Sequence, residues 1–183
     1  MKKFFKIILS LWEKSVVKLN KWDYIPNSKR KILYIAPHIY QGKKIKIADG
    51  TIISKGDHLA EIHVDNLKTT SLQNNFKNIF KVFEDELIAL TEAINNDDSF
   101  SRIKAYHGST VFDPILRRRG FTIMEFENGP KKMFLKIWIN ILRIVFRKDK
   151  LRNNNYLRIP KEFWISREHL LKDYSNKRGE IDE

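Results

Sequence analysis

The 183-residue sequence contains no cysteine, only seven glycines and five prolines, and no internal repeat. The absence of cysteine excludes disulfide bonds, thiolate metal sites and cysteine nucleophiles, and it fits a reducing compartment. With 42% hydrophobic and 31% charged residues, the composition is that of a globular chain and not of a low-complexity or disordered one. The length is sufficient for one domain with a sizeable core.

A long hydrophobic run is also missing. No stretch of about 18 apolar residues is present, so a transmembrane helix is not expected. Lys2 and Lys3 followed by an apolar segment resemble the start of a signal peptide, but Lys6 interrupts that segment and no small-residue cleavage site follows. We therefore expect an uncleaved protein on the cytoplasmic side of the cell membrane.

Acidic residues are scarce in two segments, which carry nearly all of the net charge of +13. Residues 1–22 contain six lysines and one glutamate, and residues 131–152 contain eight basic residues and one aspartate. The rest of the chain is close to neutral. The sequence thus describes a nearly neutral body that carries two basic segments.

Both basic segments have helical periodicity, over residues 2–21 and 131–148, with one basic stripe on an otherwise apolar helix. This pattern is typical of helices at an anionic membrane surface, where basic side chains reach lipid phosphates and the apolar face enters the acyl region. The predicted membrane contacts are Lys3, Phe4, Phe5, Lys6, Ile8, Trp12, Lys14, Lys132, Lys136, Trp138, Arg143 and Arg147. The alternative is that both helices pack on the core and leave only a solvated basic face.

Between and after these helices the pattern predicts a single α+β domain (mixed α/β), with residues 1–22 as an N-terminal helix, 23–175 as the body and 176–183 as a charged tail. The expected elements begin with a β-meander over 32–39, 43–47 and 58–64, followed by a long helix from Asp65 or Asn66 to about 95. A strand–helix–strand unit is expected next, over 102–107, 109–119 and 121–126. A strand over 162–165 and a helix over 166–174 end the domain. Glu84, Asp85, Glu86 and Glu92 are expected on the exposed side of the long helix.

Several short motifs, in their order along the chain, resemble the YkoP-like family. They are Asp49-Gly50-Thr51, Gly56-Asp57, Glu61-Ile62-His63, Asn66, Gly108-x-Thr110, Arg118-Arg119-Gly120-Phe121 and Trp164-Ile165-Ser166-Arg167. This family is a small bacterial domain that also occurs attached to some polysaccharide deacetylases. The resemblance implies an accessory role in cell-envelope lipid or polysaccharide metabolism, and it supplies no catalytic residues.

One candidate pocket combines two predicted strand ends. His63 and His107 are the candidate catalytic residues, as general acid or base, and Gly108, Ser109 and Thr110 are expected at a helix start that binds a phosphate or carboxylate. Asn66, Arg119 and Arg167 are the other candidate substrate-binding residues. The alternative is that Ser109 or Thr110 is only a helix cap and His63 only a strand residue.

Two further classes of function receive weaker support. His63, Asp65 and His107 have side chains suited to zinc or manganese, but no H-x-H or H-E-x-x-H motif is present, so we expect no metal and no cofactor. The basic cluster 117–119 and the sequence pI near 9.8 suit nucleic acid, but no nucleic-acid-binding motif accompanies them. The expected partners are therefore an anionic membrane surface and, at the pocket, a phosphorylated or lipid-linked ligand.

Overall fold

The computed structural model describes residues 2–65, 68, 76–110, 113–127, 129–146 and 159–175. The N-terminal basic segment forms helix α1 (Lys2–Asn20), as predicted. Lys21 ends it with a left-handed φ of 52°, and the Trp22 amide donates to the Val17 carbonyl at 3.1 Å. This closure is the usual way in which a helix satisfies its last carbonyl groups.

A six-stranded mixed sheet forms the body of the protein, in the order β1-β2-β5-β6-β8-β7. Its strands are β1 (Asp23–Tyr24), β2 (Leu33–Ile39), β5 (His58–Val64), β6 (Ala105–Thr110), β7 (Thr122–Glu125) and β8 (Lys161–Ser166). The pair β5–β6 is parallel and every other neighbouring pair is antiparallel. The predicted α+β class is confirmed.

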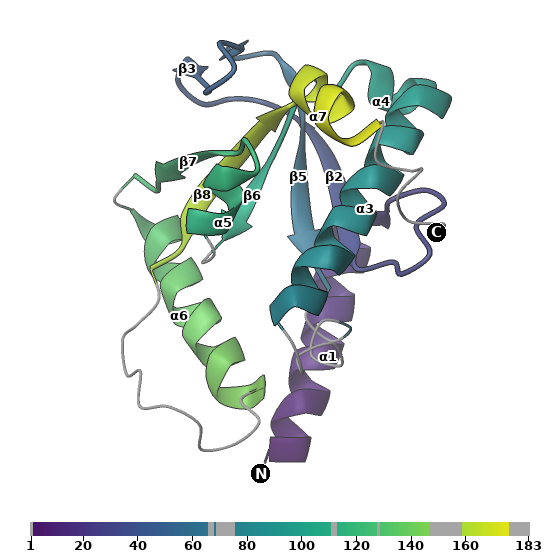
Figure 1. The fold of residues 1–183 in the computed structure, drawn as a ribbon. Helices are drawn as coiled ribbons and strands as arrows, with labels where there is room; N and C mark the ends of the chain where they lie inside the picture. Colours follow the sequence, from purple (N-terminus) through teal and green to yellow (C-terminus); the bar gives the residue numbers. More distant parts are fainter. Residues whose placement is uncertain are drawn as a thin grey trace.

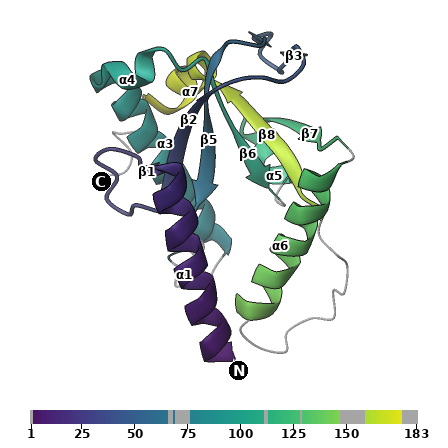
Figure 2. The same cartoon turned by 180° about the vertical axis from the view of Figure 1, so that it is seen from behind.

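The other elements are β3 (Ile45–Lys46) and β4 (Ile52–Ile53), and the helices α3 (Phe76–Asn96), α4 (Asp98–Ser101), α5 (Asp113–Arg118), α6 (Pro130–Phe146) and α7 (Arg167–Tyr174). Helices α3, α5 and α7 cover one face of the sheet (Figure 1). Seen from behind, α1 and the β3–β4 hairpin lie on the opposite side, and α1 and α6 extend beyond the end of the sheet (Figure 2).

The main core lies between the sheet and the helices on its first face. It joins Ile35, Ile62 and Phe163 of the sheet to side chains of α3, α5 and α7, including Leu90, Leu116 and Leu170. A smaller cluster lies under the hairpin on the other face, formed by Ile47, Ile53, Leu59, Ala105 and Trp164. The hairpin thus covers only part of that face.

The predicted meander is wrong in its pairing. β2 pairs directly with β5 over seven residues, while β3 and β4 form a separate two-stranded sheet. Gly50, with a φ of 91°, provides the tight turn that brings β3 back onto β4. The longer β2–β5 pairing prevails because it makes more ladder bonds and buries Leu33, Ile35 and Ile62 in the main core.

The predicted helix over 109–119 begins too early. Ser109 and Thr110 belong to β6, where they pair with Glu162 and Lys161 of β8, and α5 covers only Asp113–Arg118. Gly108 is also inside this strand, where a Cβ atom would lie 2.7 Å from both the Ile62 carbonyl oxygen and the Phe163 ring. The glycine is therefore required by close packing in the sheet and not by a helix start.

Three predicted helix-capping residues are observed at the ends of helices. Gly120 follows α5 with a φ of 83°, and the Ser166 hydroxyl caps α7 by accepting a hydrogen bond from the His169 amide at 2.9 Å. Asp65 accepts from the Lys68 amide at 2.9 Å, as an N-cap does. The predicted helix that follows is described from Phe76 onward, and Asn66 lies outside the described residues.

Candidate functional site

The sheet face opposite the main core carries a group of polar side chains, which we call the polar face. Side chains alternate between the two faces along each strand, and residues paired across strands share a face. Because Ile35, Ile62 and Phe163 point into the main core, their neighbours in each strand point the other way. The polar face consists of Tyr34 and His38 of β2, Glu61 and His63 of β5, His107 and Ser109 of β6, and Glu162 of β8.

Two histidines meet at the centre of the polar face. The Nε2 atoms of His38 and His107 lie 3.2 Å apart, with the ring planes at 74°. His107 is buried, and its ring stacks on Trp164 with centroids 4.4 Å apart. One ring must be neutral at Nε2 to accept the proton of the other, so the pair holds a shared proton in the absence of any other bound group.

His63 lies farther along the same face and is covered by an aromatic ring. The Trp22 ring stacks on it at 3.6 Å with an interplanar angle of 11°, and its Nε2 atom is 3.5 Å from the Glu61 carboxylate. That nitrogen is buried and has no hydrogen-bond partner in the part of the chain that the structure describes. Glu61 thus lies close to His63 without a well-formed hydrogen bond.

A tyrosine network closes the edge of the polar face. The hydroxyls of Tyr24 and Tyr34 are 2.7 Å apart, and Tyr24 donates to the Asp65 carboxylate at 2.8 Å. Burial, followed by the hydrogen bonds with Tyr34 and Asp65, raises the pKa of Tyr24 well above its usual range. The Tyr24 hydroxyl therefore stays protonated and acts as a donor.

The structure assembles the predicted pocket only in part. His63, His107 and Ser109 share the polar face, and the parallel register that pairs Ile62 with Gly108 places His63 and Ser109 side by side. Thr110 points to the opposite face, where it is buried. The helix start that was to bind an anion through Gly108, Ser109 and Thr110 does not exist, because these residues are in β6.

The two predicted arginines, Arg119 and Arg167, contact residues that do not belong to the polar face. Arg119 forms an ion pair with Glu84 of α3 at 2.6 Å. Arg167 donates to the Ser101 carbonyl and lines a separate cavity of about 330 Å³ with Arg102, Lys104 and His58, among others. Neither arginine can therefore supply charge to a ligand held by His63 and Ser109.

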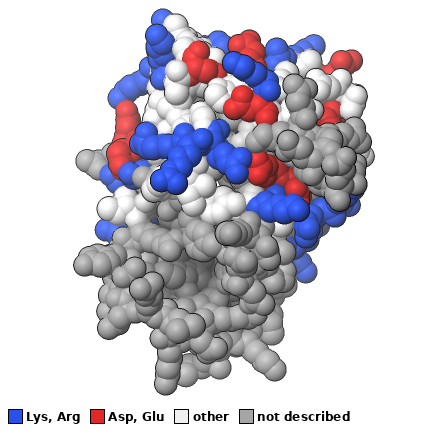
Figure 3. All heavy atoms as spheres, in the orientation of Figure 1, with Lys and Arg blue, Asp and Glu red and all other residues white. Residues whose placement is uncertain are grey.

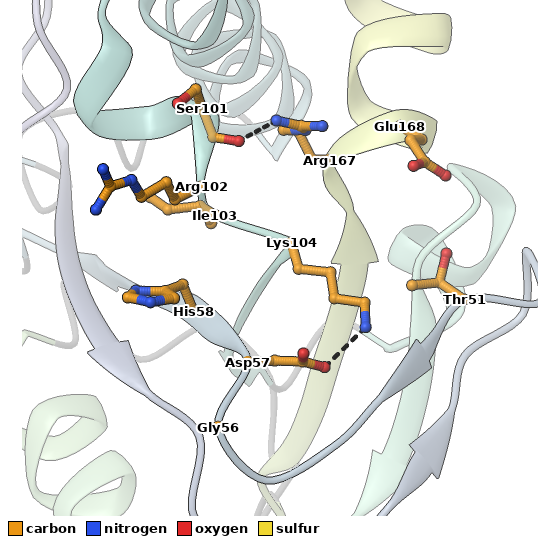
Figure 4. A pocket seen from close by; sticks show the side chains of 10 residues that line it. All are labelled: Thr51, Gly56, Asp57, His58, Ser101, Arg102, Ile103, Lys104, Arg167 and Glu168. Atoms are coloured by element: carbon orange, nitrogen blue, oxygen red, sulfur yellow. Dashed lines mark hydrogen bonds and ion pairs between the residues drawn. The ribbon is translucent and has the colours of Figure 1, made fainter.

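The cavity beside α7, which we call the basic pocket, is shown in Figure 4. Lys104 points to Asp57 and donates to its carboxylate at 2.8 Å, and Arg167 points to Ser101 (Figure 4). The hydrogen bond from Lys104 holds the pKa of Asp57 below its usual range. Because two of its three Lys and Arg side chains, Lys104 and Arg167, already bind protein oxygens, the pocket attracts anions less strongly than its composition suggests.

Sequence reasoning identified His63, His107 and Ser109 but missed His38, Glu61, Glu162 and the tyrosine network as members of one surface. Glu61 lies two residues before His63 in β5, and this alternation is a local signal that could have found it. No group of three or more His, Asp or Glu side chains among the described residues is arranged to hold a metal ion.

The predicted membrane helices contact one another and expose apolar side chains. Trp12 of α1 and Trp138 of α6 lie with ring centroids 4.4 Å apart, and Phe134 stacks on Trp138 at 6.4 Å. Lys14 and Lys136 are exposed and Lys132 is half-buried. The side chains of Lys3, Phe4, Phe5, Lys6, Ile8 and Arg143, and the whole of Arg147, lie outside the described part of the structure.

Charge on the helix-covered face of the sheet is mixed. Lys and Arg side chains there are interspersed with Asp and Glu (Figure 3). Arg117 and Arg118, in the last turn of α5, are exposed, while Arg119 is paired with Glu84. Among the described residues on this face, basic and acidic side chains are mixed, whereas a nucleic-acid backbone is typically bound by a continuous basic stripe.

These features define a class of protein: a single α+β domain with a mixed six-stranded sheet, one face packed on helices and the other bearing a histidine-rich polar cluster. The chain belongs to the YkoP domain family, whose model matches residues 2–174, a region that includes α1. It is 27% identical to Uncharacterized protein YkoP of Bacillus subtilis (strain 168) over 169 residues, which are 86% of this chain and 89% of that protein. The resemblance seen in the sequence motifs is thereby confirmed. No solved structure matches the chain.

Within the residues that the structure describes, no helix is both long enough and apolar enough to cross a bilayer.

Proposed function

We propose that this protein is a peripheral membrane protein that binds an anionic lipid surface through α1 and α6, at the cytoplasmic face of the cell membrane. The proposal rests on the concentration of exposed hydrophobic side chains on these two helices. Six of the ten large hydrophobic side chains that remain exposed in the described structure belong to these two helices. They are Leu11, Trp12, Leu19, Met133, Phe134 and Ile137.

The apolar residues of these helices are not all required by the core. Leu19 is 81% exposed, Met133 64% and Leu11 62%, so each leaves a large apolar area in water. Several exposed apolar side chains gathered on two helices that contact one another are typical of a surface that meets lipid or another protein. Basic side chains on the same helices, such as Lys14 and Lys136, favour an anionic lipid surface, where each contributes about 1 kcal/mol.

The helices form one surface because α1 and α6 contact one another through Trp12 and Trp138. Two amphipathic elements that bind together retain the protein far better than either alone, since the second binds at high effective concentration. We extend this proposal to an accessory role in envelope lipid or polysaccharide metabolism. The reasons are the membrane location and the occurrence of YkoP-like domains attached to some polysaccharide deacetylases.

The test is co-sedimentation of the full-length chain with neutral and anionic vesicles at physiological salt. Binding to anionic vesicles only, weakened by Phe134→Glu, is the expected result. Ile39→Glu is the matched control, because Ile39 is 50% exposed against 54% for Phe134 but lies at the hairpin end of β2. No binding by the unaltered chain, or equal loss in both variants, would overturn the proposal. Binding of duplex DNA with a steep salt dependence would favour the nucleic-acid alternative instead.

A second candidate is an enzyme that acts on a phosphorylated or lipid-linked substrate at the polar face. The observation in its favour is that His63, His107 and Ser109 share one sheet surface, with Ser109 exposed. Thr110 takes no part because it points into the core. Titration with inorganic pyrophosphate, followed by amide NMR shifts, is expected to move the signals of His63 and Ser109. Shifts confined to Lys104 and Arg167 would assign the ligand to the basic pocket.

A further inference from the structure

We infer that His38 and His107 form a binding site for a divalent transition-metal ion such as zinc, nickel or copper. The juxtaposition that carries this inference is that of the two Nε2 atoms, which come from strands β2 and β6 and lie 3.2 Å apart. His38 and His107 take no part in the proposed membrane contact. The metal site and the membrane contact can therefore be tested independently.

The separation of the nitrogens suits a shared ion. Zinc–imidazole bonds are about 2.0–2.1 Å long, so two such ligands at a tetrahedral angle place their nitrogens about 3.3 Å apart. The observed 3.2 Å is close to this value. The ion would take the place of the proton that the two rings otherwise share. That proton would move to the Nδ1 atom of His107, or to solvent if the pair carries an extra proton, so that both Nε2 lone pairs face the ion.

The proton on His38 is already in the position that a metal ligand requires. Its Nδ1 atom lies 3.3 Å from the Ala36 carbonyl oxygen, which can only accept a hydrogen bond. This contact places the ring proton on Nδ1 and leaves the Nε2 lone pair directed at His107. A backbone carbonyl that binds the far nitrogen of a histidine is the common outer support of metal-ligating imidazoles.

His107 is held rigidly enough to act as the second ligand. It is 6% exposed, stacks on Trp164 at an interplanar angle of 15°, and lies in a strand that pairs on both sides. Glu61 is its partner in the parallel register, and the Glu61 carboxylate lies on the same face, 3.5 Å from the His63 Nε2 atom. Sites on strands hold their ligands more precisely than sites on loops do.

The site is an open one. No group of three protein ligands is in place in the described residues, so water or a bound small molecule must complete the coordination. Imidazole ligands favour copper, nickel and zinc over magnesium or calcium, and affinity is expected to follow the order copper above nickel and zinc. An ion with open positions is the arrangement that binds and polarises an oxygen-containing ligand.

The experiment is titration of the untagged, full-length chain with zinc chloride, followed by calorimetry and by histidine-ring NMR. One equivalent of zinc is expected to bind and to move the Nε2 signals of His38 and His107. His38→Gln is expected to weaken binding more than tenfold, because loss of even an outer support costs about 10–100-fold. His58→Gln, an exposed histidine at the start of β5, is the matched control and is expected to change nothing.

His107→Gln alters a buried residue, so its fold is checked by circular dichroism, and the half-exposed His38 decides the matter if that variant is unfolded. The absence of one-equivalent binding would overturn the inference. So would binding that survives His38→Gln, or that disappears in His58→Gln. In those cases the two histidines are a hydrogen-bonded pair only.

Discussion

The indole rings of Trp12 and Trp138 lie with centroids 4.4 Å apart and planes at 43°, and this contact joins α1 to α6 across 126 residues of chain. It brings together two helices, one from each of the two segments that carry nearly all of the net positive charge. Neither basic helix is therefore an independent appendage, and a change in one is expected to affect the other.

Loss of the tryptophan contact is expected to loosen α1. Aromatic pairs contribute about 0.5–1.5 kcal/mol beyond area burial, so Trp12→Ala is expected to speed amide exchange in α1 by about 2- to 10-fold. Exchange in β5 and β6 is expected to stay unchanged. Leu19→Ala serves as the control because Leu19 is 81% exposed. Equal exchange in α1 of both variants would show that the contact does not hold the helix.

Charge on the two helices is expected to set affinity for anionic vesicles. Removing one lysine near the surface costs about 1 kcal/mol, so Lys14→Ala and Lys136→Ala are each expected to weaken binding about fivefold. Lys55→Ala is the control, since Lys55 is exposed in the turn before β5, at the other end of the sheet. Equal weakening by all three substitutions would point to net charge rather than to a defined membrane surface.

Glu86 is expected to be the most sensitive acidic residue for stability. It is 1% exposed on α3, and its carboxyl group accepts hydrogen bonds from the Ser28 hydroxyl and from the amides of Ile32 and Leu33, the latter at 3.0 Å. Glu86→Ala leaves these donors unsatisfied at about 1–3 kcal/mol each, so a loss of about 3 kcal/mol or more in the free energy of unfolding is expected.

Urea denaturation measures this effect. Asp85→Ala is the control. The Asp85 carboxylate makes a long ion pair, at 3.8 Å, with the partly exposed Arg30, and such a pair contributes less than about 1 kcal/mol. Glu86→Gln retains one acceptor oxygen and is expected to be intermediate. A loss for Glu86→Ala no larger than that for Asp85→Ala would contradict the structural role assigned to the buried carboxyl group.

Asp57 is expected to contribute to acid sensitivity. The hydrogen bond from Lys104, followed by that from the Ser54 amide, lowers the pKa of Asp57 in the folded protein. A group whose pKa is lowered by folding stabilises the folded state at pH values above its pKa in the unfolded chain, which is about 3.9 for Asp. This contribution is lost as the pH falls through the pKa of the group in the folded protein. Asp57→Asn is therefore expected to be less stable than the unaltered chain at pH 7, with the difference shrinking below about pH 4.

Urea midpoints at pH 7, 5 and 3 test this expectation. Lys104→Met is the companion variant, since it removes the first cause of the lowered pKa and is expected to flatten the same part of the pH profile. A stability difference between Asp57→Asn and the unaltered chain that does not change with pH would show that the ion pair plays no part in acid unfolding.

Local periodicity was enough to predict most helices and strands. The helix α1, the capping serine before α7 and the glycine after α5 each depend on residues a few positions apart, and all three are observed. The helix predicted over 109–119 failed because Ser109 and Thr110 suit a helix cap as well as a strand. Their pairing with β8, some 50 residues later, decided between the two.

The site was predicted less well than the fold. His107 and His63 were found because they are adjacent to polar residues in the sequence, whereas His38 is separated from His107 by 69 positions. Glu86 was expected on the exposed side of its helix, yet it is buried because the turn before β2 needs an acceptor for its donors.

The sequence by itself therefore determined the class of the domain, the two basic helices and the ends of several elements, because these follow from side-chain spacing within a few turns or one strand. The tertiary structure alone decided that β2 pairs with β5, that β8 enters between β6 and β7, and that His38 meets His107. Strand partners are chosen by which pairing buries the most apolar surface on the helix-covered face, and that choice also selects the polar residues that meet on the opposite face.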